Sequence, residues 1–202
     1  MRLVTDDQTH FKNGIIRTIT LSLEAANDAA EQLSYVEWIP STVGYKHNVF
    51  RVRELIDSHQ RHALSIGVDR ASQISCHLID SILPKALKII KKYWNIKVNR
   101  YSGQQFTRYD AGHFIRLHKD SGAAYPDRLF TVVTYLNTDY CGGEIFFPRF
   151  GERFHPAVGE TLIFPCDFAH GVEAVTEGRK EIFLFFIDRE PRRVRSSAPE
   201  AL

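Results

Sequence analysis

The spacing of apolar residues changes near Asn95, and this change limits the folds open to the chain. Between Asp69 and Trp94, apolar residues recur at intervals close to 3.6, the period of an α-helix, and Pro84 should kink or divide that helix. After Asn95 the pattern shortens to a period of two, in short stretches rich in aromatic and β-branched residues. Many short strands with regular turns favour a mainly β (α+β) chain built on a sandwich or barrel.

Several shorter elements are predicted from local patterns. Residues 16–21 favour a strand, and Ser22 can cap a following helix, because its side-chain oxygen can accept a hydrogen bond from the first turn. Residues 35–39 and 48–53 favour the two strands of a hairpin, with Pro40 and its successors as breakers. The strands predicted after Asn95 are residues 104–109, 114–118, 129–136, 144–147, 161–164, 168–175 and 181–187.

The length of 202 residues and the 44% hydrophobic content suit one domain with one core. We expect residues 1–202 to form a single domain. Within it, residues 1–100 would be a helical and mixed support region, residues 101–190 the β core, and residues 191–202 a solvated tail. The helices of the first half are expected to cover one face of the β core.

Charge and composition exclude several classes of protein. The net charge of +2 arises from interspersed charges, which gives no basic surface for nucleic acid. The apolar runs are shorter than the roughly 20 residues that span a bilayer, and the N-terminus lacks the pattern of a signal peptide. Three cysteines without metal-binding spacing fit reduced thiols. We therefore expect a cytoplasmic protein without nucleic-acid or membrane partners, whose oligomeric state the sequence leaves open.

The motif His118-Lys119-Asp120 and the later His170 are candidates for a metal site. In a strand, side chains two residues apart lie on the same face, so His118 and Asp120 should point toward a common position. A second imidazole from a distant strand would complete two histidines and one carboxylate on one side of a metal. This arrangement leaves positions open on iron(II) for a cosubstrate and oxygen.

The stretch RYDAGHFIRLHKD, which begins at Arg108, carries a family resemblance together with later motifs in a fixed order. These motifs are VTYLN from Val133, GGEIFFP from Gly142, PAVGETLIF from Pro156, HGV from His170 and GR from Gly178. Over residues 104–188 the chain resembles the iron(II)- and 2-oxoglutarate-dependent dioxygenases, and most closely their prolyl 4-hydroxylase-like branch. The resemblance implies a double-stranded β-helix, or jelly roll, with N-terminal helices packed on one face.

The resemblance also implies a metal centre and its cosubstrates. His118, Asp120 and His170 match the catalytic iron(II) ligands of the family, and 2-oxoglutarate and O2 would be cosubstrates, with ascorbate as a candidate reductant. Asp120 stands where related halogenases have a small residue, which favours hydroxylation over chlorination. Hydroxylation of an unactivated C–H bond would release succinate and CO2.

Three residues match the family's cosubstrate-binding positions. Arg179 corresponds to the cation that pairs with the distal carboxylate of 2-oxoglutarate, and a guanidinium can bind a carboxylate in a bidentate way. Lys180 is a rival, and we prefer Arg179 because it fits the Gly-Arg register of the family. Tyr109 resembles the tyrosine whose hydroxyl bonds the cosubstrate, and Tyr135 or its neighbour Thr134 could line the same pocket.

The substrate is expected to be a small molecule or a peptide, namely an amino-acid-like, prolyl or peptidyl compound. Side chains that could meet a substrate carboxylate are those of Arg116, Lys119, Arg128 and Arg51 or Arg53, and each could equally be a surface charge. Residues 121–128 could form a lid. Two alternatives remain: a cupin-like metalloprotein without 2-oxoglutarate chemistry, and a catalytically silent metal-binding sensor.

Overall fold

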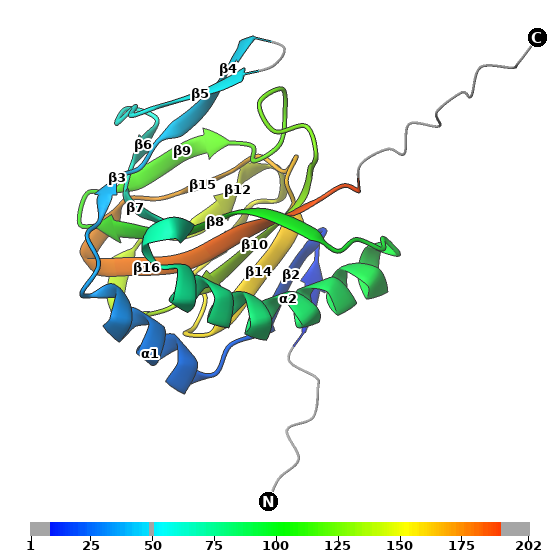
Figure 1. The fold of residues 1–202 in the computed structure, drawn as a ribbon, viewed down its shortest axis with the longest axis horizontal. Helices are drawn as coiled ribbons and strands as arrows, with labels where there is room; N and C mark the ends of the chain where they lie inside the picture. The colour runs from blue at the N-terminus through cyan, green and yellow to red at the C-terminus, as the bar shows by residue number, and fades with distance from the viewer. Residues whose placement is uncertain (1–8, 49–50, 191–202) are drawn as a thin grey trace, which may run out of the picture.

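The structure, a computed structural model, describes residues 9–48 and 51–190, so the predicted tail at 191–202 lies outside the described residues. The described chain is mainly β, as predicted, with two α-helices, α1 (Leu23–Leu33) and α2 (Ser72–Trp94) (Figure 1). Two short 3-10 helices, η1 (Val68–Arg70) and η2 (Pro148–Phe150), connect other elements. No helix within the described residues is long and apolar enough to cross a lipid bilayer.

Most strands belong to one large antiparallel sheet, which has nine strands within the described residues. Their spatial order is β1 (His10–Lys12), β2 (Ile15–Ile19), β14 (Glu160–Pro165), β10 (Arg128–Tyr135), β16 (Val175–Asp188), β8 (Arg100–Asp110), β7 (Leu64–Gly67) and β3 (Ile39–Pro40), and β11 (Tyr140–Gly142) pairs with β16. The centre of this sheet is the long strand β16, which pairs with both β8 and β10.

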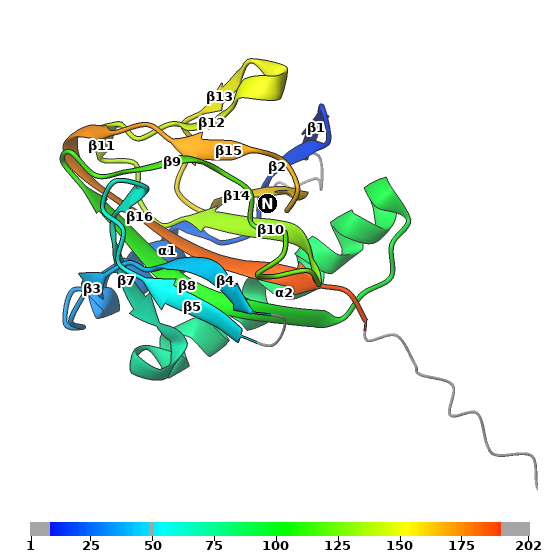
Figure 2. The ribbon, with the colours of Figure 1, turned by 90° about the horizontal axis from the view of Figure 1, so that it is seen from above.

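A smaller antiparallel sheet faces the large one (Figure 2). Its strands, in spatial order, are β13 (Glu152–Phe154), β12 (Ile145–Phe147), β15 (His170–Val172), β9 (Phe114–His118) and β6 (Arg61–His62). Buried side chains from both sheets form one apolar cluster, with Phe147 from the small sheet and Leu162 and Phe164 from the large one. Two facing antiparallel sheets with a shared apolar interior are the architecture of a jelly roll.

The other face of the large sheet packs against the two helices, which lie along it in Figure 1. Leu33 of α1 and Ile82 of α2 belong to the same buried cluster as Phe183 and Phe185 of β16. Ser22 caps α1 as predicted, since its Oγ accepts a hydrogen bond from the amide of Ala25. Strand β16 is therefore apolar on both faces, one toward the helices and one toward the small sheet.

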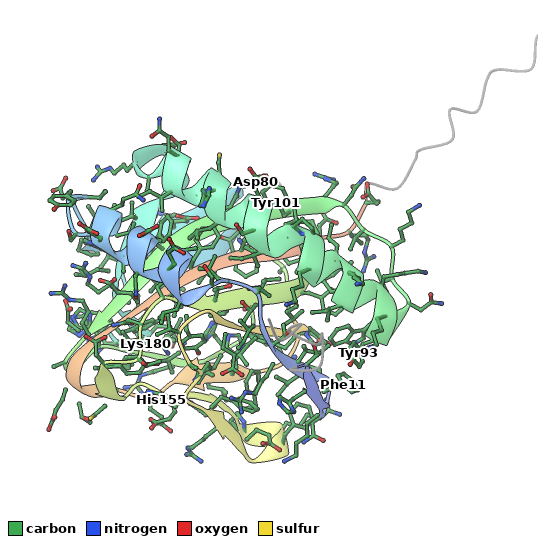
Figure 3. All side chains as sticks on the ribbon, turned by 90° about the horizontal axis from the view of Figure 1, so that it is seen from below. Phe11, Asp80, Tyr93, Tyr101, His155 and Lys180 are labelled. Atoms are coloured by element: carbon green, nitrogen blue, oxygen red, sulfur yellow. The ribbon has the colours of Figure 1, made fainter. Side chains whose placement is uncertain are left out.

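The first strand also contacts the helical layer. Phe11 of β1 stacks on Tyr93 near the end of α2, with ring centroids 5.0 Å apart (Figure 3). Trp94 lies beside both rings, and its own ring packs on Phe130 of β10 at 4.8 Å. Aromatic contacts therefore join the two sheet strands to the C-terminal end of α2.

Some predicted elements differ from the structure. The hairpin consists of β4 (Val43–Asn48) and β5 (Arg51–Leu55), and residues 49–50 lie outside the described chain. The predicted first strand at residues 35–39 is therefore wrong except for Ile39, which lies in β3. The predicted second strand at 48–53 is divided between β4 and β5, and the expected breakers include the start of β4. Tyr35 is 84% exposed, and the alternation there reflects burial of single side chains without strand pairing. Pro84 does not divide α2, which runs through it without interruption. The short strands β11 and β13 were not predicted.

Candidate metal centre

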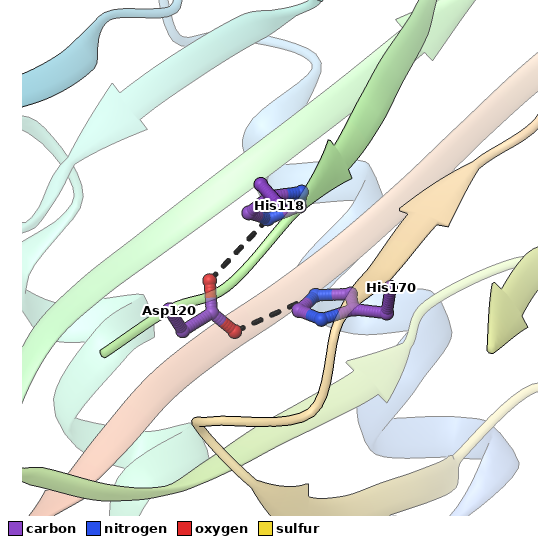
Figure 4. Close-up of side chains that lie close together, drawn as sticks. All are labelled: His118, Asp120 and His170. Atoms are coloured by element: carbon purple, nitrogen blue, oxygen red, sulfur yellow. Dashed lines mark ion pairs between the residues drawn. The ribbon is translucent and has the colours of Figure 1, made fainter. Parts of the chain in front are cut away.

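His118, Asp120 and His170 come together in the interior between the two sheets. One potential ligand atom from each residue lies within 4.8 Å of the others. Nε2 of His118 is 3.4 Å from Oδ1 of Asp120, and Nε2 of His170 is 3.5 Å from Oδ2 (Figure 4). Strands β9 and β15 pair with His118 directly opposite His170, so the strand register brings the two imidazoles together.

Backbone carbonyls orient both imidazoles. Nδ1 of His118 lies 2.9 Å from the carbonyl oxygen of Arg116, and Nδ1 of His170 lies 3.0 Å from that of Phe168. A carbonyl only accepts hydrogen bonds, so each Nδ1 donates and each neutral ring keeps the lone pair on Nε2. In this tautomer the Nε2 lone pair of each ring lies on the side of Asp120, as metal ligation requires.

The electrostatics keep Asp120 and His170 in the forms that bind metal. Burial acts to raise the pKa of Asp120, but His170, His118 and the Thr131 hydroxyl together outweigh burial and hold that pKa well below its usual range. Burial lowers the pKa of His170 to about 4, although Asp120 opposes the change. An ionised carboxylate and neutral imidazoles are the forms that bind metal. Two neutral imidazoles and one hard carboxylate therefore fit iron(II).

Thr131 of β10 fixes the Asp120 carboxylate. Its Oγ1 donates a 2.6 Å hydrogen bond to Oδ2, and the thiol of buried Cys166 lies 3.2 Å from the same Oγ1. We expect Thr131→Val to weaken metal binding about 10- to 100-fold, because ligand-orienting partners typically contribute that much to affinity. Anaerobic calorimetric titration with Fe(II) measures the change. Thr131→Ser keeps the hydroxyl and serves as the control, and an unchanged affinity in Thr131→Val would contradict an orienting role.

The three candidate ligands line a cavity of about 630 Å³, and Lys180 lines it as well. Lys180, labelled in Figure 3, is fully buried, and its Nζ donates a 2.7 Å hydrogen bond to the carbonyl of Gly143. The ammonium also lies 5.2 Å from the ring centre of Tyr109 and 5.1 Å from that of Tyr135. Burial lowers the pKa of Lys180 to about 7, and Glu144 opposes part of that shift.

The structure places the side chain of Arg179 away from the cavity. Its side chain is 54% exposed and forms an ion pair with Asp110, 3.3 Å away, on the side of the sheet opposite Lys180. Lys180 stands opposite Tyr109 in β8, and directly paired residues share a face. The pairing of β11 with β16 shifts register a few residues before Lys180. The face on which Lys180 lies therefore cannot be found by counting alternate residues along β16. Tyr109 and Tyr135 are both buried and line the cavity.

The other charged residues proposed for the cavity mouth occupy different places. Lys119 and Arg128 line the cavity, and the Arg128 guanidinium lies between the rings of Tyr125 and Phe186, 3.7 and 3.6 Å from their centres. Arg116 instead donates to the carbonyl of His59 and is not part of the cavity wall. Arg53 is exposed, and the side chain of Arg51 is outside the described part of the chain. Residues 121–125 of the expected lid border the cavity.

The family model of the 2OG-Fe(II) oxygenase superfamily matches residues 104–188, which include all three candidate ligands and Lys180. This stretch of the chain is similar to that superfamily. The superfamily implies Fe(II) as the metal and 2-oxoglutarate and O2 as cosubstrates. The donor set formed by His118, Asp120 and His170 fits that metal.

Relatives in the superfamily include prolyl hydroxylases. Prolyl 3-hydroxylase 2 of Mus musculus is 28% identical over 151 residues, which cover 58% of this chain and 21% of that protein. The chain thus spans about a fifth of the length of this relative.

Two solved structures of prolyl hydroxylases share the fold. The viral collagen prolyl hydroxylase of Paramecium Bursaria Chlorella virus-1, solved as a 2OG complex, has a TM-score of 0.61 and 18% identity, with 88% of this chain and 97% of that chain covered. A Trichoplax adhaerens prolyl hydroxylase, in complex with a hypoxia inducible factor peptide fragment, has a TM-score of 0.68 and 17% identity, with coverage of 93% and 89%. At these identities the likeness shows the jelly-roll fold.

Proposed function

We propose that this chain is a 2-oxoglutarate-dependent hydroxylase in which His118, Asp120 and His170 hold Fe(II). The observation that carries the proposal is that these three side chains share one cavity with a buried ammonium group. Bound Fe(II) would couple the oxidation of 2-oxoglutarate by O2, which yields succinate and CO2, to the insertion of one oxygen atom into a substrate C–H bond.

We propose that Lys180, rather than Arg179, binds the distal carboxylate of 2-oxoglutarate. Among the described residues, no carboxylate lies at hydrogen-bond distance from the Lys180 ammonium. Such a group is costly to bury, and a bound dicarboxylate would supply the counter-charge. Tyr109 and Tyr135 flank the ammonium and would lie beside the same carboxylate. Arg179, on the outer side of β16, would take no part.

Apolar side chains form part of the cavity wall between these groups. Val133, Ile145 and Ile182 line the cavity and belong to the buried cluster between the sheets. Such side chains exclude water, which strengthens the attraction between Lys180 and a carboxylate and limits side reactions. The chain itself would therefore orient the cosubstrate, keep the site dry and leave one side of the metal position open to the substrate.

For the substrate, we propose an amino-acid-like, prolyl or peptidyl compound. The names of the relatives point to prolyl groups, and one solved structure holds a peptide fragment. Residues 121–125 and parts of the β4–β5 hairpin border the cavity, and we propose that such a compound enters beside them. We also propose that the helices and both sheets act as one domain, because the helices share a buried cluster with β16.

An anaerobic titration tests the hydroxylase assignment. Fe(II) and 2-oxoglutarate together should produce the visible charge-transfer band of the chelate, and air should then release succinate. The absence of both would refute the assignment. A silent metal-binding sensor would give the band without succinate under any substrate. A cupin-like protein would give neither, since it has no use for the buried ammonium of Lys180.

A further inference from the structure

A second cation, Arg61, lines the cavity that contains the candidate metal ligands. Arg61 lies in β6 at the edge of the small sheet, and its side chain reaches the large sheet. Nη2 donates to Oγ1 of Thr107 at 3.2 Å, and Nη1 donates to the carbonyl of Thr42 at 3.4 Å. The guanidinium thus bridges the two sheets at the rim of the cavity.

The hydrogen bonds of Arg61 leave part of the guanidinium unsatisfied. Its Nε is buried and has no hydrogen-bond partner, and the group has no carboxylate partner among residues 9–48 and 51–190. A buried donor without an acceptor costs free energy, so such atoms are rare in proteins unless a ligand or water completes them. The Nε–H edge of Arg61 is therefore a place where an acceptor is missing.

Neighbouring polar side chains hold the guanidinium in place. Thr107 is fully buried, and its Oγ1 accepts from both Arg61 and Nε2 of Gln105. Gln105 also donates to Oγ of Ser65 at 2.6 Å, and Ser65 bonds to buried Ser41. A network anchored in two strands of the large sheet fixes the cation before any ligand arrives, which lowers the cost of binding one.

The charges of the cavity favour an anion. The cations that line it are Arg61, Lys119, Arg128 and Lys180, and the acidic residues are Glu54 and Asp120. Glu54 already accepts hydrogen bonds from Tyr125 and Thr42. The charges of Fe(II) and of the 2-oxoglutarate dianion cancel each other, so the loaded cavity keeps its surplus of positive charge. Complementary charge selects the binding partner more than it adds affinity.

We propose that Arg61 binds a carboxylate of the substrate, so that the substrates of this chain are carboxylic acids. The inference rests on the proposed hydroxylase function and adds the chemical class of its substrate. A carboxylate can accept from the Nε–H edge of a guanidinium in a bidentate way, which satisfies the missing acceptor. The carboxylate could belong to a free amino acid or to an acidic residue or C-terminus of a peptide.

Matched pairs of compounds test the inference in the intact protein. Amino acids and short peptides with a free carboxylate are compared with the same compounds as amides, and substrate-stimulated succinate release is measured. The acids should stimulate at least tenfold more than their amides. If free amino acids respond, the source is a small molecule, and if only peptides respond, it is a peptide. Equal stimulation by acid and amide, or none by either while the charge-transfer band is present, would overturn the inference.

Substitutions locate the effect at Arg61. Arg61→Gln should raise the KM for the best acid at least 100-fold, with the KM for 2-oxoglutarate within twofold of wild type, and Arg61→Lys should be intermediate. Arg70→Gln, which removes an exposed guanidinium paired with Glu37, is the matched control and should leave both constants unchanged. A normal KM for the acid in Arg61→Gln, or a defect confined to 2-oxoglutarate, would assign Arg61 a different role.

A third measurement follows ligand binding in the wild-type protein and needs no turnover. In protein labelled with ¹⁵N-arginine, and loaded with Zn(II) and 2-oxoglutarate, the Nε–Hε signal of Arg61 should shift when the acid is added and stay in place with its amide. Arg61→Lys identifies the signal. An unmoved signal would overturn the inference. Loss of the charge-transfer band in wild-type protein, by contrast, would refute the hydroxylase function itself.

Discussion

Asp120→Asn is expected to abolish succinate formation and to weaken Fe(II) binding by more than roughly 100-fold. This loss exceeds the 10- to 100-fold typical of residues that only hydrogen-bond to a metal ligand. The amide keeps the shape of the side chain but removes the negative charge that faces both imidazoles. The substitution also leaves only the two neutral imidazoles to hold the metal, without the hard anionic oxygen that iron(II) favours. Anaerobic calorimetry measures the affinity, and succinate assays in air measure the activity.

Asp110→Asn is the matched control for this substitution. Asp110 is also a carboxylate near the end of a strand, but it pairs with Arg179 outside the cavity. The control should keep the Fe(II) affinity and the activity of the wild type. Circular dichroism of both variants checks that the fold is intact. Tight Fe(II) binding by a folded Asp120→Asn variant would place the metal elsewhere and remove the basis of the proposed function.

Lys180→Met should raise the concentration of 2-oxoglutarate needed for half-saturation by roughly 100-fold or more. Truncating one partner of a buried charge pair typically costs about 2–5 kcal/mol, and every 1.4 kcal/mol is tenfold in affinity. Methionine fills much of the same volume, so the loss of charge dominates the change. Titration of the charge-transfer band measures the affinity. Fe(II) affinity alone should stay near the wild-type value, because Lys180 is not among the candidate ligands.

Arg179→Met is the control for Lys180→Met. Its guanidinium is half-exposed and pairs with Asp110 on the outer side of the sheet, so its loss should change the 2-oxoglutarate affinity less than twofold. Reversed results, with a large effect at Arg179 and a small one at Lys180, would restore Arg179 as the residue that binds the cosubstrate.

The pH dependence of 2-oxoglutarate binding should report the same lysine. Burial lowers the pKa of Lys180 to about 7 in the free protein, with Glu144 opposing the shift and the Tyr109 and Tyr135 rings beside it. Only the ammonium form attracts a carboxylate, so the affinity should be constant below pH 7. Above pH 7 it should fall by up to about tenfold per pH unit. Lys180→Arg stays charged and should show a flat profile between pH 7 and 9.

The candidate ligands could be predicted from sequence because their signal is local. His118 and Asp120 are two residues apart at the end of a strand whose predicted bounds match β9. His170 required the family motif as well, since its position opposite His118 depends on the pairing of two strands that are distant in the sequence. Most strands of the C-terminal half were also predicted, because aromatic and β-branched residues there lie between clear breakers. The predicted strand at residues 168–175 is instead divided between β15 and the start of β16, and β8 and β16 are longer than predicted.

The choice between Arg179 and Lys180 could not be made from the sequence. Strand β16 buries one face against the helices and the other against the small sheet. Polar and apolar residues therefore do not alternate along it, and the sequence does not show which of its residues face the cavity. Arg61 and Thr131 were missed for a related reason. Their roles depend on which strands pair across the sheets, and a single arginine or threonine in a strand carries no local sign of its partners.

The position of β16 has a consequence for engineering. Phe183 and Phe185 pack on the helices, whereas Lys180 and Ile182 face the cavity from the same short stretch of backbone. A larger or smaller side chain beneath the helices would shift that backbone, and the ammonium would move with it, because close-packed interiors transmit strain. Attempts to stabilise the helical layer would therefore alter the affinity for the cosubstrate, even though no redesigned atom touches it.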